Sequence, residues 1–194
     1  MTFSSPRFVP VLAAALIASA TLVGHASNAP IARYSAQAVD ITAPQGRAAS
    51  QVGIEITRWS TDAERDALNT ALWEKGQPAL FETLRKMPSV GVIHGTGAAG
   101  YDLRFARRTI QPNGGENIVI ATDRPIAFWE AATIAESTQY PFAVVELHLR
   151  SDGRGEGRMS IAARLSADKN SKTLMLENYT MAQVQLQNVR TEKN

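Results

Sequence analysis

Hydrophobic positions recur with two different periods along this 194-residue chain, and the changes of period divide it into segments. Ile54 and Ile56 alternate with Glu55 and Thr57, which is the two-residue period of a half-buried strand. From residue 61 the apolar positions take helical spacing, and from residue 90 the period is again mostly two. The pattern therefore predicts one strand, then helices, then a series of strands.

The helical segment carries start and stop signals. Thr61 and Glu64 form a T-x-x-E capping box, and Gly76 supplies the stop of the first helix. Pro78 is placed to open a second helix that Pro88 ends. Each helix has apolar residues along one side. We therefore predict a helical hairpin that needs a packing partner.

The second half of the chain predicts three hairpins. The turns are "QPNGG" (111–115), "SDGRGEG" (151–157) and "TMA" (180–182), each between two alternating runs. In the last run, Val184 and Leu186 alternate with glutamines, as in an antiparallel sheet with one wet face. The sequence predicts an α+β fold: an antiparallel meander of about seven to eight strands, able to curl into a half-barrel, with the helical hairpin packed on its dry face.

The N-terminus has the three parts of a secretory signal: Arg7, an apolar run over 8–23 and a small-x-small site ending at Ala26. The alternative is an uncleaved anchor, but the run is about 16 residues, is interrupted by Pro10, and falls short of the roughly 20 that a spanning helix needs. We expect a signal peptide over 1–26, a flexible leader over 27–50 and a single domain over 51–194. The expected location is periplasmic or secreted, with no membrane span after cleavage.

Composition limits the chemistry. The chain has no cysteine, which excludes disulfides, thiolate metal sites and a cysteine nucleophile. The net charge is +2, and the segment from residue 101 to residue 164 contains eight arginines and eight acidic residues. Because nucleic-acid binding needs a basic excess, we expect no nucleic-acid partner.

The stretch "HGTGAAG" (94–100) matches the G-x-G-x-x-G pattern of a dinucleotide-binding turn, and Asp123 lies near the offset of a ribose-binding acid. That fold needs a helix after the last glycine, whereas Tyr101, Leu103 and Phe105 alternate as in a strand and only hairpins follow. We therefore interpret the stretch as a loop joining the helices to the sheet and expect no cofactor.

The metal-like patterns have simpler interpretations. In the loop at 151–157, Arg154 lies between Asp152 and Glu156, which argues against calcium and favours a glycine-rich turn. His94 and His148 lie in no metal-ligand spacing, and we expect no metal site.

The richest local cluster is "ATDRPIAFWEAA" (121–132). Asp123, Arg124 and Trp129, with Arg104, could line a cleft in which an arginine pairs with a small anionic ligand and the tryptophan stacks on it. The alternative, which we favour, is that Trp129 plugs the core and Asp123 pairs with Arg124 or Arg104. In "RFARR" (104–108), strict alternation would place Arg104 and Arg108 on one face and Arg107 on the other.

Three segments, "IEITRWSTDAERDALNTAL", "ATDRPIAFWEAA" and "LENYTMAQVQLQNV", resemble parts of small exported bacterial proteins of unassigned function, over roughly residues 53–190. The resemblance implies bacterial export and no catalytic residue. Our first hypothesis is a non-catalytic binding or interaction module of the cell envelope, whose partner is an envelope component or a small anionic ligand. The second is a small periplasmic hydrolase whose acid and base meet only in the fold.

Overall fold

A computed structural model describes residues 29–40, 49–126, 141–168, 173–178 and 183–192. Within these residues the chain forms nine strands and two helices. Their bounds are β1 (Ala32–Asp40), β2 (Ala49–Ile56), α1 (Asp62–Lys75), α2 (Gln77–Lys86), β3 (Gly91–Gly95), β4 (Tyr101–Ile110), β5 (Glu116–Thr122), β6 (Phe142–Leu149), β7 (Arg154–Asp168), β8 (Thr173–Asn178) and β9 (Gln183–Glu192).

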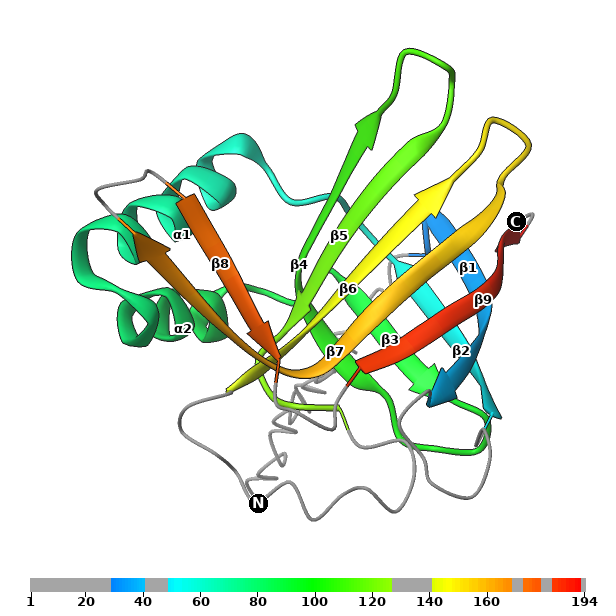
Figure 1. Cartoon of the computed structure of the whole chain (residues 1–194), viewed down its shortest axis with the longest axis horizontal. Coiled ribbons are helices and arrows are strands. Elements are labelled where there is room, and N and C mark those ends of the chain that lie inside the picture. The colour runs from blue at the N-terminus through cyan, green and yellow to red at the C-terminus, as the bar shows by residue number, and fades with distance from the viewer. Residues whose placement is uncertain (1–28, 41–48, 127–140, 169–172, 179–182, 193–194) are drawn as a thin grey trace, which may run out of the picture.

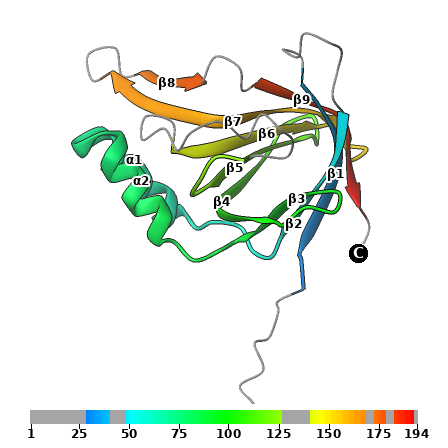
Figure 2. The same cartoon turned by 90° about the horizontal axis from the view of Figure 1, so that it is seen from below.

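The sheet closes on itself into a barrel, and the two helices lie together on one side of it (Figures 1 and 2). Antiparallel pairing runs from β1 in order to β7, continues from β7 to β9, and returns from β9 to β1. The predicted α+β class, with an antiparallel sheet against a helical hairpin, is confirmed. Closure of the barrel pairs the edges that an open meander would leave exposed.

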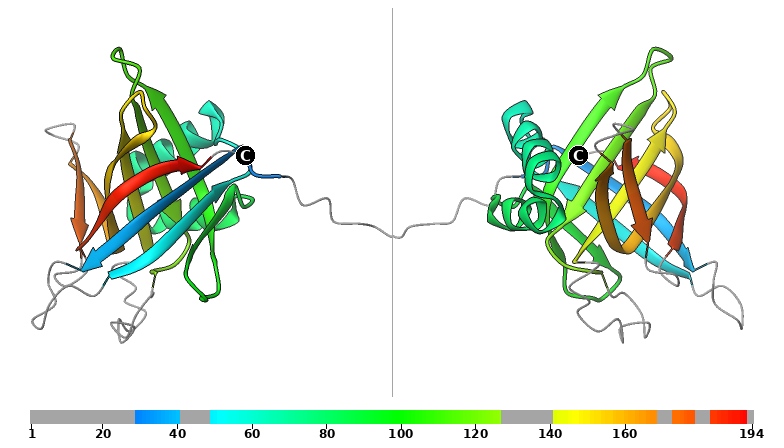
Figure 3. Two further views of the ribbon diagram at one scale, coloured as in Figure 1. Left: turned by 90° about the vertical axis from the view of Figure 1, so that its right-hand side faces the viewer. Right: turned by 60° about the vertical axis from the view of Figure 1, so that its left-hand side comes forward.

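The expected leader over 27–50 is wrong where β1 lies, because Ala32–Asp40 form a strand between β2 and β9 (Figure 3, left). Tyr34, Ala36 and Ala38 are buried inside the barrel, and burial, with the charge of Glu116 as a second cause, raises the pKa of Tyr34 to about 12. The sequence pattern did not predict this strand, because most of its inward residues are alanines, which give a weak hydrophobic alternation. The expected signal peptide (1–26) lies outside the described residues.

The barrel has two apolar surfaces, one inside and one outside. The inward side chains of the strands pack on one another and fill the interior, as Val145, Leu147 and Met159 do. The helical hairpin covers a separate patch on the outer wall, centred on Phe142, Val144 and Ala163 (Figure 3, right). Our expectation that the helices would cover the main dry face is therefore wrong, because closure already buries that face against itself.

Strand β7 is 15 residues long and has three neighbours. Ala163 pairs with Phe142 of β6 on one side and with Asn178 of β8 on the other. Ser160 likewise pairs with β6 on one side and with Gln183 of β9 on the other. Strands β8 and β9 therefore follow one another along the same edge of β7. The predicted hairpin between them is wrong, whereas the turns at 111–115 and 151–157 do join paired strands.

The predicted capping box begins α1. The backbone N–H of Glu64 donates to the hydroxyl oxygen of Thr61 (3.2 Å), and the N–H of Thr61 donates to the Glu64 carboxylate (2.8 Å). Arg58 donates two further hydrogen bonds to the same carboxylate (2.8 and 3.0 Å). The Arg58 hydrogen bond is the largest cause that lowers the pKa of Glu64 from 4.5 to about 2. These contacts attach α1 to the segment that follows β2.

We expect Glu64→Gln to lower the free energy of unfolding by about 1–2 kcal/mol at pH 7, a figure reduced for the partial exposure of the pair. Because the pKa is lower in the folded state, this stabilisation is present above about pH 4.5 and is lost as the pH falls towards 2. Urea unfolding of both proteins across this range measures the difference. The control is Glu82→Gln, which removes an exposed ion pair with Arg85 on α2 and should cost under about 0.5 kcal/mol. A difference that does not vary with pH would contradict the prediction.

Within the described residues, neither helix combines the length and the apolar character needed to cross a membrane.

Candidate functional site

Three of the four residues predicted from the sequence come together at one end of β4 and β5. The Nε of Arg104 donates to Asp123 (2.7 Å), and Arg104 also contacts Asp102 (3.3 Å). Arg124 lies over the ring of Tyr101, 5.0 Å from its centroid. Trp129 lies outside the described residues. The Arg104–Asp123 pair agrees with the alternative in which these charges bind each other, and a ligand at this cluster stays a prediction.

A bulge in β4 changes the expected facing of its arginines. The register against β5 shifts between Leu103 and Phe105. Leu103 and Ala106 belong to the interior core, whereas Phe105 packs in the outer cluster under the helices. As a result the Arg107 side chain lies on the outer face of the barrel wall. Arg104 and Arg108 do not share a face, although strict alternation predicted that they would.

We expect the Arg104–Asp123 pair to stabilise the fold, because both side chains are mostly buried (22% and 16% exposed). Asp123→Asn should lower the free energy of unfolding by about 2 kcal/mol, and a double-mutant cycle with Arg104→Gln should give a coupling above about 1 kcal/mol. The control is Arg124→Ala, whose exposed ring contact should be worth only about 0.5 kcal/mol. Additive effects of the two substitutions in urea unfolding would refute the coupling.

The remaining sequence motifs form turns. Residues 96–100 connect β3 to β4 directly, and β4 starts at Tyr101 where a dinucleotide-binding fold would need a helix. The stretch is thus a hairpin connection between strands and not the predicted link from helices to sheet. At residues 150–153, Asp152 accepts a hydrogen bond from the N–H of Arg154 (3.0 Å), and Gly153 has φ 74°, as a glycine-rich turn requires. Across the described ranges, no three His, Asp or Glu side chains are grouped as a metal site would need.

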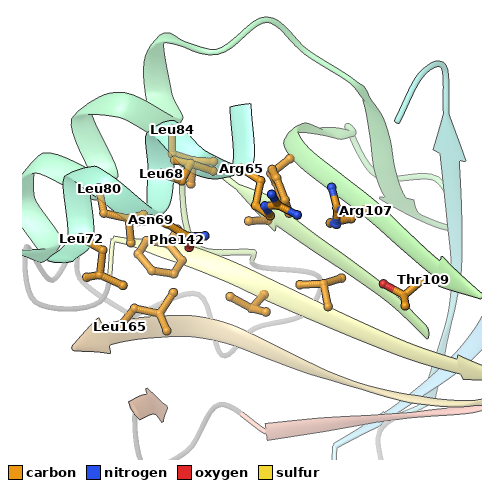
Figure 4. A pocket seen from close by; sticks show the side chains of 14 residues that line it. Arg65, Leu68, Asn69, Leu72, Leu80, Leu84, Arg107, Thr109, Phe142 and Leu165 are labelled. Carbon is orange, nitrogen blue, oxygen red and sulfur yellow. The ribbon is translucent and has the colours of Figure 1, made fainter. Parts of the chain in front are cut away.

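A pocket lies between the helical hairpin and the outer wall of the barrel (Figure 4). Its volume is about 310 Å³, and its walls come from α1, α2 and strands β4 to β7. Ten of its 14 lining residues are apolar, and the other four are Arg65, Asn69, Arg107 and Thr109. Sites that bind small molecules are typically concave and mostly apolar with a few polar groups, which this pocket matches.

One end of the pocket is lined mainly by apolar side chains. Leu72 of α1, Leu80 of α2 and Phe142 of β6 lie together there, and each is buried (Figure 4). Leu165 of β7 also lines this end. The position of α2 at this wall follows from the tight turn at Gly76 (φ 80°), which joins the two helices.

The other end of the pocket is open and polar. Arg65, Arg107 and Thr109 lie towards it, whereas the Asn69 amide lies beside Phe142 (Figure 4). Arg107 donates a hydrogen bond to Asp62 (2.8 Å), and this bond lowers the pKa of the exposed Asp62 carboxyl below its usual value. The pocket therefore has an apolar end and an end rich in hydrogen-bond donors.

The sequence prediction missed this pocket. Its basic residues belong to one helix and one strand that are separated by about 40 residues in sequence, and no local motif joins them. One signal was available: Phe142, Ala143, Val144 and Val145 are all apolar, and all four are buried. A strand apolar on both faces indicates that its outer face is covered too.

Comparison of this chain with protein-family models, with curated proteins and with solved structures finds no match.

Proposed function

We propose that this protein is a non-catalytic binding module that holds a small hydrophobic ligand between its helical hairpin and the outer wall of its barrel. The observation that carries the proposal is the pocket of about 310 Å³ with ten apolar lining residues. The barrel interior is filled by its own side chains, so this outer pocket is the apolar space that we assign to a ligand. Removing apolar ligand surface from water would supply the binding free energy.

We also propose that the protein acts in the cell envelope. The support is the N-terminal pattern of a signal peptide: a single basic residue, an apolar run and a small-x-small site. A hydrophobic molecule that crosses an aqueous compartment needs a carrier, which is consistent with a binding module at that location. The alternative of a small hydrolase stays a prediction that no particular contact favours.

The proposal is tested with N-phenyl-1-naphthylamine, a neutral probe whose fluorescence rises in apolar surroundings. We expect saturable binding to the wild type and at least tenfold weaker binding to Ala121→Trp, because Ala121 of β5 lines the pocket and an indole there would fill it. The control is Ala63→Trp on the exposed side of α1, which should bind the probe as the wild type does.

Val119→Trp provides a second blocking variant at a position that is already 41% exposed, so it should fold even if the first variant does not. Circular dichroism shows whether each variant is folded. Absence of probe binding to the wild type, or equal binding to folded blocked variants, would overturn the proposal.

A further inference from the structure

We infer that the ligand of this pocket is a single-chain aliphatic carboxylate, with its chain towards Leu72 and Phe142 and its carboxylate at Arg107. This inference rests on the proposed function and goes further, because it names the class of ligand and its orientation. It follows from the contrast between the two ends of the pocket (Figure 4).

The size of the pocket and its apolar end favour one aliphatic chain. A volume of about 310 Å³ is near the lower limit for small-molecule sites, so a molecule with two long chains would not fit inside. The apolar end offers Leu72, Leu80 and Phe142, which are all buried, and its polar group is the uncharged amide of Asn69 beside Phe142 (Figure 4). A carboxylate placed there would leave water without gaining a cationic partner.

The open end favours a negative head group. Arg107 and Arg65 both approach the same oxygen of Asp62, at 2.8 and 3.4 Å, so their guanidinium groups flank one point where a carboxylate already binds. Asp62 is 73% exposed and can move into solvent when another carboxylate arrives. The bond to Asp62 occupies one of the five N–H donors of Arg107, which leaves donors for a ligand oxygen.

Arg107 should contribute more to head-group binding than Arg65. Arg65 directs its Nε and one terminal nitrogen to Asp66 (2.9 and 2.7 Å), so an adjacent acid already neutralises much of its charge. Arg107 comes from the barrel wall, and its side chain is 33% exposed at the pocket opening. The decisive substitution is therefore at Arg107.

The test measures displacement of the naphthylamine probe by decanoate and by 1-decanol, which share a ten-carbon chain and differ in charge. The alcohol is the more hydrophobic of the two, so apolar burial alone predicts that it binds more tightly. We expect decanoate to bind about tenfold more tightly than 1-decanol, since hydrogen bonds to a charged group are stronger than neutral ones. Arg107→Gln should remove this preference and change the affinity for 1-decanol less than twofold.

Arg85→Gln is the matched control. It removes one positive charge, as Arg107→Gln does, but from α2, where Arg85 pairs with Glu82 and lies over the Phe81 ring, outside the pocket lining. Its preference for decanoate should equal that of the wild type. A chain-length series adds a second measurement: affinity should rise about fourfold per methylene from octanoate upwards until the chain fills the pocket.

Each outcome decides a different claim. Tighter binding of decanoate that Arg107→Gln abolishes and Arg85→Gln preserves would establish the inference. Equal binding of acid and alcohol, or a preference that Arg107→Gln leaves intact, would overturn the carboxylate site while the hydrophobic pocket stands. Probe binding that neither compound displaces would overturn the inference as well. Absence of probe binding would overturn the proposed function itself.

Discussion

Ala38→Asp is expected to lower the free energy of unfolding by about 4 kcal/mol or more, a large fraction of the roughly 5–15 kcal/mol that stabilises an ordinary domain. Ala38 of β1 is 0% exposed and lies in the interior core of the barrel, where its neighbours across the sheet are Ser50 and Leu186. An aspartate there would place a charge in an apolar interior without a partner. Because protonation removes that charge, the loss should be smaller at low pH.

The control is the adjacent residue. Gln37→Asp introduces the same side chain into the same strand, but Gln37 is exposed and its cross-strand neighbours are Gln51 and Gln187. The free energy of unfolding of this variant should be less than about 1 kcal/mol below that of the wild type. Urea unfolding followed by circular dichroism compares the two variants. Equal stability would mean that β1 does not form part of the barrel wall, and the assignment of Ala32–Asp40 as a strand would be withdrawn.

Gly155→Ala is expected to lower the free energy of unfolding by about 3 kcal/mol, although it adds only one methyl group. Gly155 lies in β7 between Leu149 of β6 and Val189 of β9, where the barrel closes. A Cβ at this position would overlap the backbone carbonyl oxygen of His148. The overlap can be relieved only by a shift of the backbone, which would disturb pairing on both sides of β7.

Gly97→Ala separates this steric effect from the general cost of replacing glycine. Gly97 has φ 71° in the connection from β3 to β4, and a Cβ there would meet no atom within 4 Å. Gly97→Ala should lower the free energy of unfolding by about 1 kcal/mol, because alanine is strained in the left-handed backbone conformation. A thermal-melting series should therefore rank wild type, Gly97→Ala and Gly155→Ala in decreasing order. The reverse order would show that β6 and β7 do not pack as closely as described.

Local features of the fold were predictable because neighbouring residues decide them. The capping box at Thr61 and Glu64 and the stop at Gly76 are interactions within one or two turns of a helix. The turns at 111–115 and 151–157 depend on glycines that accept positive φ, as Gly114 and Gly153 do. The alternation of Val184 and Leu186 with glutamines also reports directly on which side of a strand is buried.

The candidate site was only partly predictable. Asp123, Arg124 and Arg104 do lie close together, because the pairing of β4 with β5 brings their ends to one edge. The pocket depends on where the helical hairpin packs on the outer wall of the barrel, and no local sequence pattern specifies that position. Arg107 reaches the opening of the pocket only because the bulge before Phe105 shifts the facing of β4.

Hydrophobic period, caps and turn residues act over a few neighbours, so the class of the fold, the helical hairpin and most strands can be inferred from the chain's residues. Three arrangements are visible only in the folded protein: β1 closes the barrel, β8 and β9 share one edge of β7, and the helices cover the outer wall. These arrangements depend on which distant surfaces bury each other best. That free energy belongs to pairs of segments far apart in the chain, and no single segment encodes it.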